Sequence, residues 1–207
     1  MAFVEGSGSG FVFVGNYLYL DFANTLLVED GRLVDLLDDY SDLVRWLLEA
    51  GVLGPEEAKE ALERWGDGPE GERVFTRALE FRKVLFRLIE EIVGGDPVGQ
   101  ETLDETNVLL RSRPGYAQVA RADEGFKMRF LAERDEAINA IVPLAESAAD
   151  FLLSAIPSLL KKCENPSCVL HFYDTSKNHA RRWCSMSGCG NRIKAAAHYR
   201  RQRRHEA

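Results

Sequence analysis

The segments CENPSC at residues 163–168 and CSMSGC at residues 184–189 contain all four cysteines of this 207-residue chain. Their spacing is C-x4-C-x15-C-x4-C, and each pair encloses residues that are typical of tight turns. Two such pairs can supply the four ligands of a tetrahedral zinc ion. Cytosolic thiols are kept reduced, so four clustered cysteines in a chain without a secretory signal favour a metal over disulfides. The spacing therefore predicts one structural Zn²⁺ per chain.

Other interpretations of the cysteines are weaker. Four free buried thiols, acting as small hydrophobic side chains, would have to pair by chance in a polar, basic segment. A catalytic zinc is disfavoured because four thiolates leave no position for water or substrate. His171, His179 or His198 could replace one cysteine ligand, although an exposed or packed histidine is the simpler interpretation of each. We therefore expect an all-cysteine site.

The charge is divided unevenly along the chain. Residues 161–207 contain 11 of the 26 Lys and Arg and 3 of the 33 Asp and Glu, a net charge of +8. Residues 1–160 contain the other 15 and 30, a net charge of −15. Some of the positive charge can offset the formal −2 of a zinc ion with four thiolates, but not all of it.

A basic helix is expected over residues 191–204, which contain three consecutive alanines and neither Pro nor Gly. Solvated helix faces usually mix charges of both signs, whereas the charges here are nearly all positive. This pattern favours contact with nucleic acid. The residues expected to bind nucleic acid are Arg181, Arg182, Arg192, Lys194, Arg200, Arg201, Arg203 and Arg204.

The rest of the chain has the composition of a globular domain, with 45% hydrophobic and 29% charged residues. Hydrophobic periodicity and turn residues predict helices over 42–50, 56–65, 72–93 and 100–110, and a last helical region over 133–160 that is broken or kinked at Pro143 and Pro157. Hairpins are predicted for 11–14 with 17–20, around Gly15-Asn16, and for 116–121 with 126–131.

The predicted fold is therefore α+β: a mainly α body with one or two β-hairpins, followed by a small treble-clef-like zinc finger that has four cysteines and ends in a basic helix. We place the body at residues 1–158 and the finger at residues 159–207. No apolar stretch approaches the roughly 20 residues that span a bilayer, and the N-terminus lacks the features of a signal peptide. We expect a cytoplasmic protein that does not enter a membrane.

Polar residues after the first predicted hairpin have two interpretations. Asp21, Asn24 and Thr25 could cap a helix or line a ligand pocket. Trp46 and Trp65 are expected in the core, and Arg45 and Arg82 on the surface. The sequence contains no phosphate loop, nucleophile elbow or dinucleotide fingerprint, so we expect no enzymatic activity.

Several short motifs resemble a known pair of domains. FYDTS at 172–176, RWCSM at 182–186 and CGNR at 189–192 look like the CGNR zinc finger of bacterial proteins, and the match extends from Cys163 to about Arg203. LDFANT at 20–25 resembles the ABATE domain that usually precedes this finger. The resemblance implies a stress-responsive transcription regulator in which the finger binds DNA and the body senses a signal.

The resemblance also implies roles for single residues. By position, Cys163, Cys168, Cys184 and Cys189 are the zinc ligands. Gly190 would allow a tight turn, Asn191 would cap the following helix, and Arg192 would contact a phosphate or the thiolates. Trp183 would belong to the core of the finger.

The sequence thus predicts a zinc-dependent DNA-binding regulator whose acidic body binds a small-molecule effector or forms a homodimer. The alternative is an RNA- or protein-binding module in which zinc is purely structural. An acidic body and a basic C-terminal segment could also attract each other, within one chain or between two.

Overall fold

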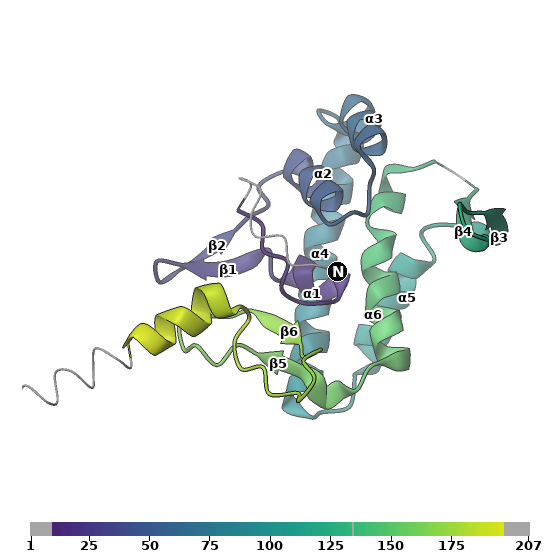
Figure 1. Ribbon diagram of the computed structural model, residues 1–207. Coiled ribbons are helices and arrows are strands. Elements are labelled where there is room, and N and C mark those ends of the chain that lie inside the picture. The colour runs from purple at the N-terminus through teal and green to yellow at the C-terminus, as the bar shows by residue number, and fades with distance from the viewer. Residues whose placement is uncertain (1–9, 134, 197–207) are drawn as a thin grey trace, which may run out of the picture.

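The computed structural model of the chain describes residues 10–133 and 135–196 (Figure 1). Its central element is helix α4, Pro69–Gly94. Pro69 occupies the first turn, where its missing N–H costs no hydrogen bond, and Gly95 ends the helix with a left-handed φ of 79°. The apolar stripe predicted for this segment is buried along most of its length.

Five further helices of the body pack around α4 or on its neighbours. Short α1 contacts both α4 and α6, α5 also contacts both of them, and α2 and α3 pack on each other and on α4. Their bounds are Leu18–Ala23 for α1, Tyr40–Glu49 for α2, Pro55–Trp65 for α3, Gln100–Leu110 for α5 and Val142–Ser154 for α6.

The strands of the described part of the chain form three separate antiparallel hairpins. They are β1 (Leu26–Glu29) with β2 (Arg32–Asp35), β3 (Gly115–Arg121) with β4 (Phe126–Ala132), and β5 (Leu160–Lys162) with β6 (His171–Tyr173). Single turns of 3₁₀ helix occur at η1 (Ala137–Ala140) and η2 (Pro157–Leu159). The α+β prediction is confirmed.

Most of the predicted elements agree with the structure. Helices α2 to α5 begin and end within three residues of the predicted bounds, and the hairpin β3–β4 lies where it was expected. The last helical region is divided as its prolines indicated: Pro143 lies in the first turn of α6, and Pro157 begins η2.

The first predicted hairpin is wrong. Residues 11–14 form no strand, and Leu18–Ala23 is helical. The turn at Gly15-Asn16 exists, with a φ of 66° at Asn16, but it is followed by a helix, whose Asp21 carboxyl group accepts a hydrogen bond from Gly15 N at 2.7 Å. A short apolar run that is buried on all sides has the same sequence pattern whether it forms a strand or a helix. The pattern alone therefore does not distinguish the two. A different hairpin, β1–β2, follows over residues 26–35.

The core contains Trp46 as expected, but Arg82 is not on the surface. Trp46 is fully buried against Phe13 and Phe22. Arg82 is only 6% exposed and donates hydrogen bonds to Thr25 Oγ1 and Asp35 Oδ1, both at 2.8 Å, and to Asp35 Oδ2. This arginine therefore joins α4 to the β1–β2 hairpin.

Within residues 10–133 and 135–196, one stretch, Ala137–Ser154, is long and apolar enough to cross a membrane when judged by length and composition alone. Core helices commonly meet the same test. Here Leu144, Ala145 and Phe151 of this stretch are buried in the core.

Replacing Arg82 with alanine leaves the Asp35 carboxylate without its partner in a partly buried site. We expect the free energy of unfolding to fall by about 2 to 4 kcal/mol, measured by urea denaturation. Lys59→Ala, which removes one partner of an exposed pair with Glu63, is the control and should cost less than about 0.5 kcal/mol. Equal losses for the two variants would contradict the role given to Arg82.

Candidate metal centre

The first cysteine pair lies in the turn of the last hairpin. Cys163 follows β5 and Cys168 precedes β6. Cys163 N donates to Leu170 O at 2.9 Å, which extends the hairpin ladder by one bond, and Cys168 N donates to Asn165 O at 2.9 Å, which closes the turn. These bonds bring the two thiols to the same side of the hairpin.

The second pair lies at the start of a helix. Ser185 caps a turn of π-helix, η3 (Met186–Gly190), by accepting a hydrogen bond from Gly188 N at 3.0 Å. Helical residues 191–196 follow directly. Ser185, not Asn191, is therefore the cap: Asn191 has helical dihedral angles. A Cβ on Gly190 would lie 2.6 Å from Met186 Sδ, so this glycine leaves room for the Met186 side chain; its φ is not positive.

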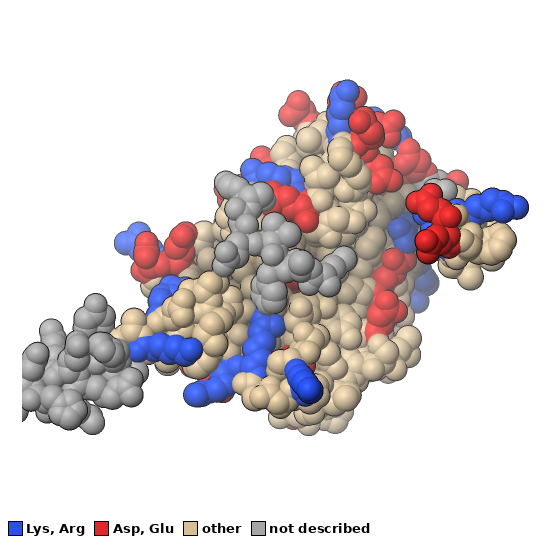
Figure 2. Space-filling model, in the orientation of Figure 1, with Lys and Arg blue, Asp and Glu red and all other residues tan. Residues whose placement is uncertain are grey.

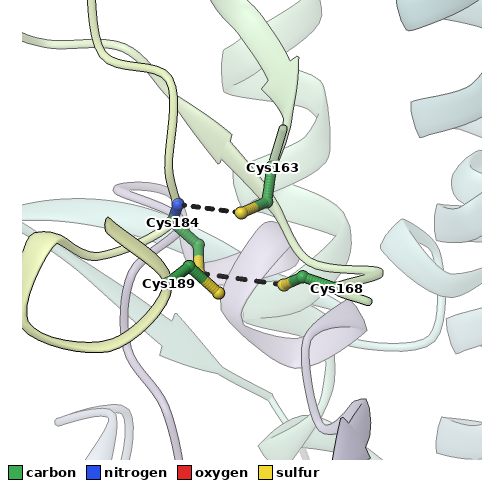
Figure 3. Close-up of side chains that lie close together, drawn as sticks. All are labelled: Cys163, Cys168, Cys184 and Cys189. Atoms are coloured by element: carbon green, nitrogen blue, oxygen red, sulfur yellow. Dashed lines mark hydrogen bonds between the residues drawn. The ribbon is translucent and has the colours of Figure 1, made fainter. Parts of the chain in front are cut away.

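The four cysteine sulfurs converge on one point (Figure 3). All four lie within 4.8 Å of one another, and Cys168 Sγ and Cys184 Sγ are 3.8 Å apart. A tetrahedral zinc with bonds of about 2.3 Å requires sulfur–sulfur distances of about 3.8 Å. None of the four forms a disulfide, and all are buried or nearly so. His171 and His179 are not part of this cluster, and His198 lies outside the described residues.

Donors around the cluster favour negatively charged sulfur. Cys184 N donates to Cys163 Sγ at 3.4 Å, and Asn165 Nδ2 donates to Cys189 Sγ at 3.2 Å. Arg192 Nη2 lies 3.9 Å from Cys189 Sγ. Of the two roles expected of Arg192, contact with a phosphate or with the thiolates, this distance is compatible with the second.

Without a cation the cluster cannot carry four negative charges. The thiols of Cys168 and Cys184 donate to the Cys163 sulfur, which lowers the pKa of Cys163. The same bonds raise the pKa values of Cys168 and Cys184, because each would lose a hydrogen bond and face an existing charge on ionising. A bound dication removes this conflict. The donor set, its spacing and its closed shape fit one structural zinc.

Asp174 organises the loop that joins the two cysteine pairs, a role that was not predicted from the sequence. Its fully buried carboxylate accepts from Lys161 Nζ at 2.7 Å, Ser176 Oγ at 2.6 Å and Arg181 N at 2.9 Å. Burial opposes ionisation, but these donors outweigh it and lower the pKa of Asp174. The Asp-Thr-Ser sequence directly after a strand was the available signal for such a turn.

The C-terminal module, residues 160–196, is joined to the body through the connecting segment, residues 14–24. The Asn24 side chain pairs with the backbone of His171: Nδ2 donates to His171 O at 2.9 Å, and Oδ1 accepts from His171 N at 3.0 Å. Tyr173 N donates to Gly15 O at 2.8 Å. The free edge of β6 is thus paired with the body.

Apolar contacts strengthen this connection. Val14 is buried in the same cluster as the four cysteines, together with Leu170 and Phe172. Leu160 of β5 belongs to the main core of the body. The metal centre and the body therefore share their packing.

Arg181 also belongs to the connection, which favours a structural role over the predicted contact with nucleic acid. Its guanidinium donates to Val14 O at 3.0 Å, to Trp183 O at 3.0 Å and to Cys184 O, and it stacks 4.1 Å above the Phe172 ring. These partners hold the partly buried guanidinium against the chain.

The other residues expected to bind nucleic acid are placed differently. Arg182 is exposed, pairs with Glu164 at 2.6 Å and covers the Trp183 ring. Arg192 and Lys194 are exposed at the start of the last helix. The remaining four, Arg200, Arg201, Arg203 and Arg204, lie outside the described residues.

Asp21, Asn24 and Thr25 are engaged by the chain itself. Asp21 accepts from Gly15 N, Asn24 pairs with β6, and Thr25 donates to Phe22 O at 2.7 Å while accepting from Arg82. Two cavities in the described part of the chain are lined by other residues. The hydrogen bonds support the structural interpretation of these three residues over the ligand pocket.

Two family models match the sequence. One, described as "ABATE: Putative stress-induced transcription regulator", matches residues 16–155. The other, described as the CGNR zinc finger, matches residues 160–202. A comparison with curated proteins finds no match. The order of the two matches agrees with the resemblance seen in the motifs.

Replacing Cys184 with serine should lower the zinc content of the purified protein well below one ion per chain, measured by atomic emission. The structure of the C-terminal module should be lost, while α4 and its neighbours keep most of the helical circular dichroism signal. Ser187→Ala changes an exposed residue of the same loop and should retain the zinc. Full zinc content in Cys184→Ser would contradict the assignment of the site.

The carboxyl group of Asp21 should make the connection sensitive to pH. Burial raises its pKa to about 7, although the Gly15 and Val14 amides and the facing Arg181 oppose the shift. The folded chain thus holds this proton to higher pH than the unfolded chain does. The stability of the wild type relative to Asp21→Asn should fall as the pH rises from about 4 to about 7, and then level off.

Chemical denaturation of both proteins across this pH range measures the difference. A tenfold change in the acid dissociation constant corresponds to about 1.4 kcal/mol. The control is Asp123→Asn, at the exposed end of the β3–β4 hairpin. Its free energy of unfolding should change with pH in the same way as that of the wild type. A pH-independent difference between the wild type and Asp21→Asn would contradict the buried, protonated state.

Proposed function

Because the chain belongs to the ABATE family and carries a CGNR zinc finger, we propose that it is a zinc-dependent DNA-binding regulator of transcription that acts in the cytoplasm. Zinc is structural here, and we infer that Cys163, Cys168, Cys184 and Cys189 are its ligands. Neither family description names a reaction, and we propose no catalytic role.

The separation of charge carries the proposal. Nearly all charged side chains that Figure 2 shows over the C-terminal module are Lys or Arg, whereas both signs mix over α2 and α3. A surface of this kind attracts the phosphates of nucleic acid, and an acidic body keeps the rest of the protein away from them. Residues 161–207, which we call the basic end, are thus the part that would contact DNA.

The metal positions this basic end. Cys189 lies in η3, and the helical residues that follow begin directly after it. Fixing Cys189 on zinc therefore fixes the start of the helix that presents Arg192 and Lys194. We propose that these two, with Arg182, Arg200, Arg201, Arg203 and Arg204, contact DNA.

The body would supply the signal. One cavity of about 310 Å³ lies between α3 and the segment from η1 to α6, at the lower end of the range for small-molecule sites. Its lining includes Arg64, Trp65, Arg113 and Asn139. This cavity, rather than the surroundings of Asp21, is the place where we propose that an effector binds.

The DNA proposal is tested by selection from a random duplex pool with zinc-loaded protein, followed by sequencing. Binding should weaken with salt by a log–log slope of about −0.9 for each phosphate neutralised. The variant with Arg200, Arg201, Arg203 and Arg204 all changed to glutamine should lose about three to four units of this slope. Arg32→Gln with Arg73→Gln, both exposed on the body, is the control and should bind as the wild type does.

The outcomes separate the competing functions. Convergence on one duplex sequence supports a sequence-reading regulator, and salt-sensitive binding without convergence supports a module that contacts only the backbone. Tighter binding of single-stranded RNA than of duplex DNA would favour the RNA-binding alternative. No binding to either would contradict the proposal and favour a protein partner.

A further inference from the structure

The hairpin β3–β4 has one apolar face. Residues directly opposite each other in an antiparallel pair point to the same side, and successive residues alternate between sides. Val119 opposes Met128 and Ala117 opposes Phe130, and Phe126 lies two positions before Met128. These five residues therefore share one side, which we call the apolar face. The other side carries Tyr116, Gln118 and Lys127.

This apolar face is exposed. Val119 is 67% exposed, Phe126 70%, Met128 70% and Phe130 42%. Figure 1 shows the hairpin standing out from the helices, and its extensive contacts are between its own two strands. Two guanidinium groups of the described residues lie over its rings: Arg113, 4.4 Å from the Phe130 ring, and Arg121, which opposes Phe126 on the same side, 5.7 Å from the Phe126 ring. A lone two-stranded hairpin is at best marginally stable in water, so this face gains from being covered.

We propose that the apolar face binds the same face of a second copy of this chain. The area agrees with this. Two aromatic rings of about 150 to 250 Å² each, with Met128 and Val119, leave on the order of 500 Å² exposed per chain. Pairing two copies would bury about 1,000 Å², near the lower limit for a specific interface. The result is a dimer that dissociates on dilution, not an obligate one.

Charge also favours a second copy at this place. Residues 1–160 carry a net charge of −15, so the bodies of two copies repel each other over most of their surface. The hairpin carries both signs: Arg121 and Lys127 lie beside the turn that contains Asp123 and Glu124. In a two-fold arrangement with the hairpins antiparallel, the acidic turn of one copy lies over the hairpin base of the other, where Arg111 is exposed.

Dimerisation through the hairpins would affect how the protein binds DNA, and this step rests on the proposed function. The hairpin and the C-terminal module lie on opposite sides of the body in Figure 1, so pairing through hairpins leaves both basic ends free. A dimer presents two of them to one DNA duplex, which raises the affinity without new contacts per chain. A dimer with two-fold symmetry matches a palindromic site.

The test is sedimentation equilibrium of the full-length, zinc-loaded protein without DNA, across a wide range of concentration and at low and high salt. The variant Phe126→Thr/Met128→Thr removes apolar area while keeping residues that favour strands. The control Leu33→Thr/Leu153→Thr removes two exposed leucines elsewhere on the body. Circular dichroism and zinc content establish that both variants are folded.

We expect the wild type and the control to dimerise, and the dissociation constant of the hairpin variant to rise at least about tenfold. High salt should leave the dimer intact or strengthen it, because it screens the repulsion between acidic bodies. A monomeric wild type would overturn the proposal, as would a hairpin variant that dimerises as well as the control does. A dimer that dissociates in high salt would instead indicate pairing of a basic end with an acidic body.

If the hairpin variant fails to fold, wild-type amide hydrogen exchange measured against protein concentration decides the question. Protection of β3 and β4 should rise with concentration, and unchanged protection would overturn the proposal. These measurements contain no DNA, so a failure of DNA binding leaves them unaffected.

Discussion

Four sulfur atoms within 4.8 Å of one another cannot all carry negative charge unless a cation neutralises them, and this constraint governs the C-terminal part of the chain. Zinc fixes the turn of the β5–β6 hairpin to the start of the last helix, and the hydrogen bond from Glu164 N to Arg182 O and the Arg182–Glu164 ion pair join the same two parts of the chain. Asn165 and the Cys184 amide aim their N–H groups at sulfur, so the peptide around the site is already arranged for thiolates. The position of the basic end follows from this geometry.

The same module is also part of the body's packing. Asn24 and Gly15 pair with the edge of β6, and Arg181 reaches from the module to Val14 O. The LDFANT sequence thus has a structural role: Asp21 holds the turn before it, Asn24 pairs with the module, and Thr25 meets Arg82. A change in the body near this segment has a direct physical route to the metal centre.

The sequence was sufficient to predict an element where the residues that determine it are close together in the chain. Proline and glycine at the ends of α4, the apolar stripe within it, and the alternation in β3–β4 all predict their own elements. The clustering of the cysteines followed from spacing and chemistry. The sequence was insufficient where the partner is distant in sequence: Val12 and Val14 pack on the module while Phe11 and Phe13 pack in the body core, and Arg82 binds the β1–β2 hairpin. The contact of Arg181 with Val14 O is another such long-range partner. A basic or apolar side chain does not reveal in advance which of these long-range partners it has.

The central claim is that zinc holds the C-terminal module and the connecting segment together as one folded unit. Amide hydrogen exchange of the zinc-loaded and zinc-stripped protein, read by mass spectrometry, tests it most directly. Removal of zinc should accelerate exchange in residues 160–190 and also in residues 14–24, while α4 and α5 stay protected. Acceleration confined to residues 160–190, with residues 14–24 unchanged, would contradict the account.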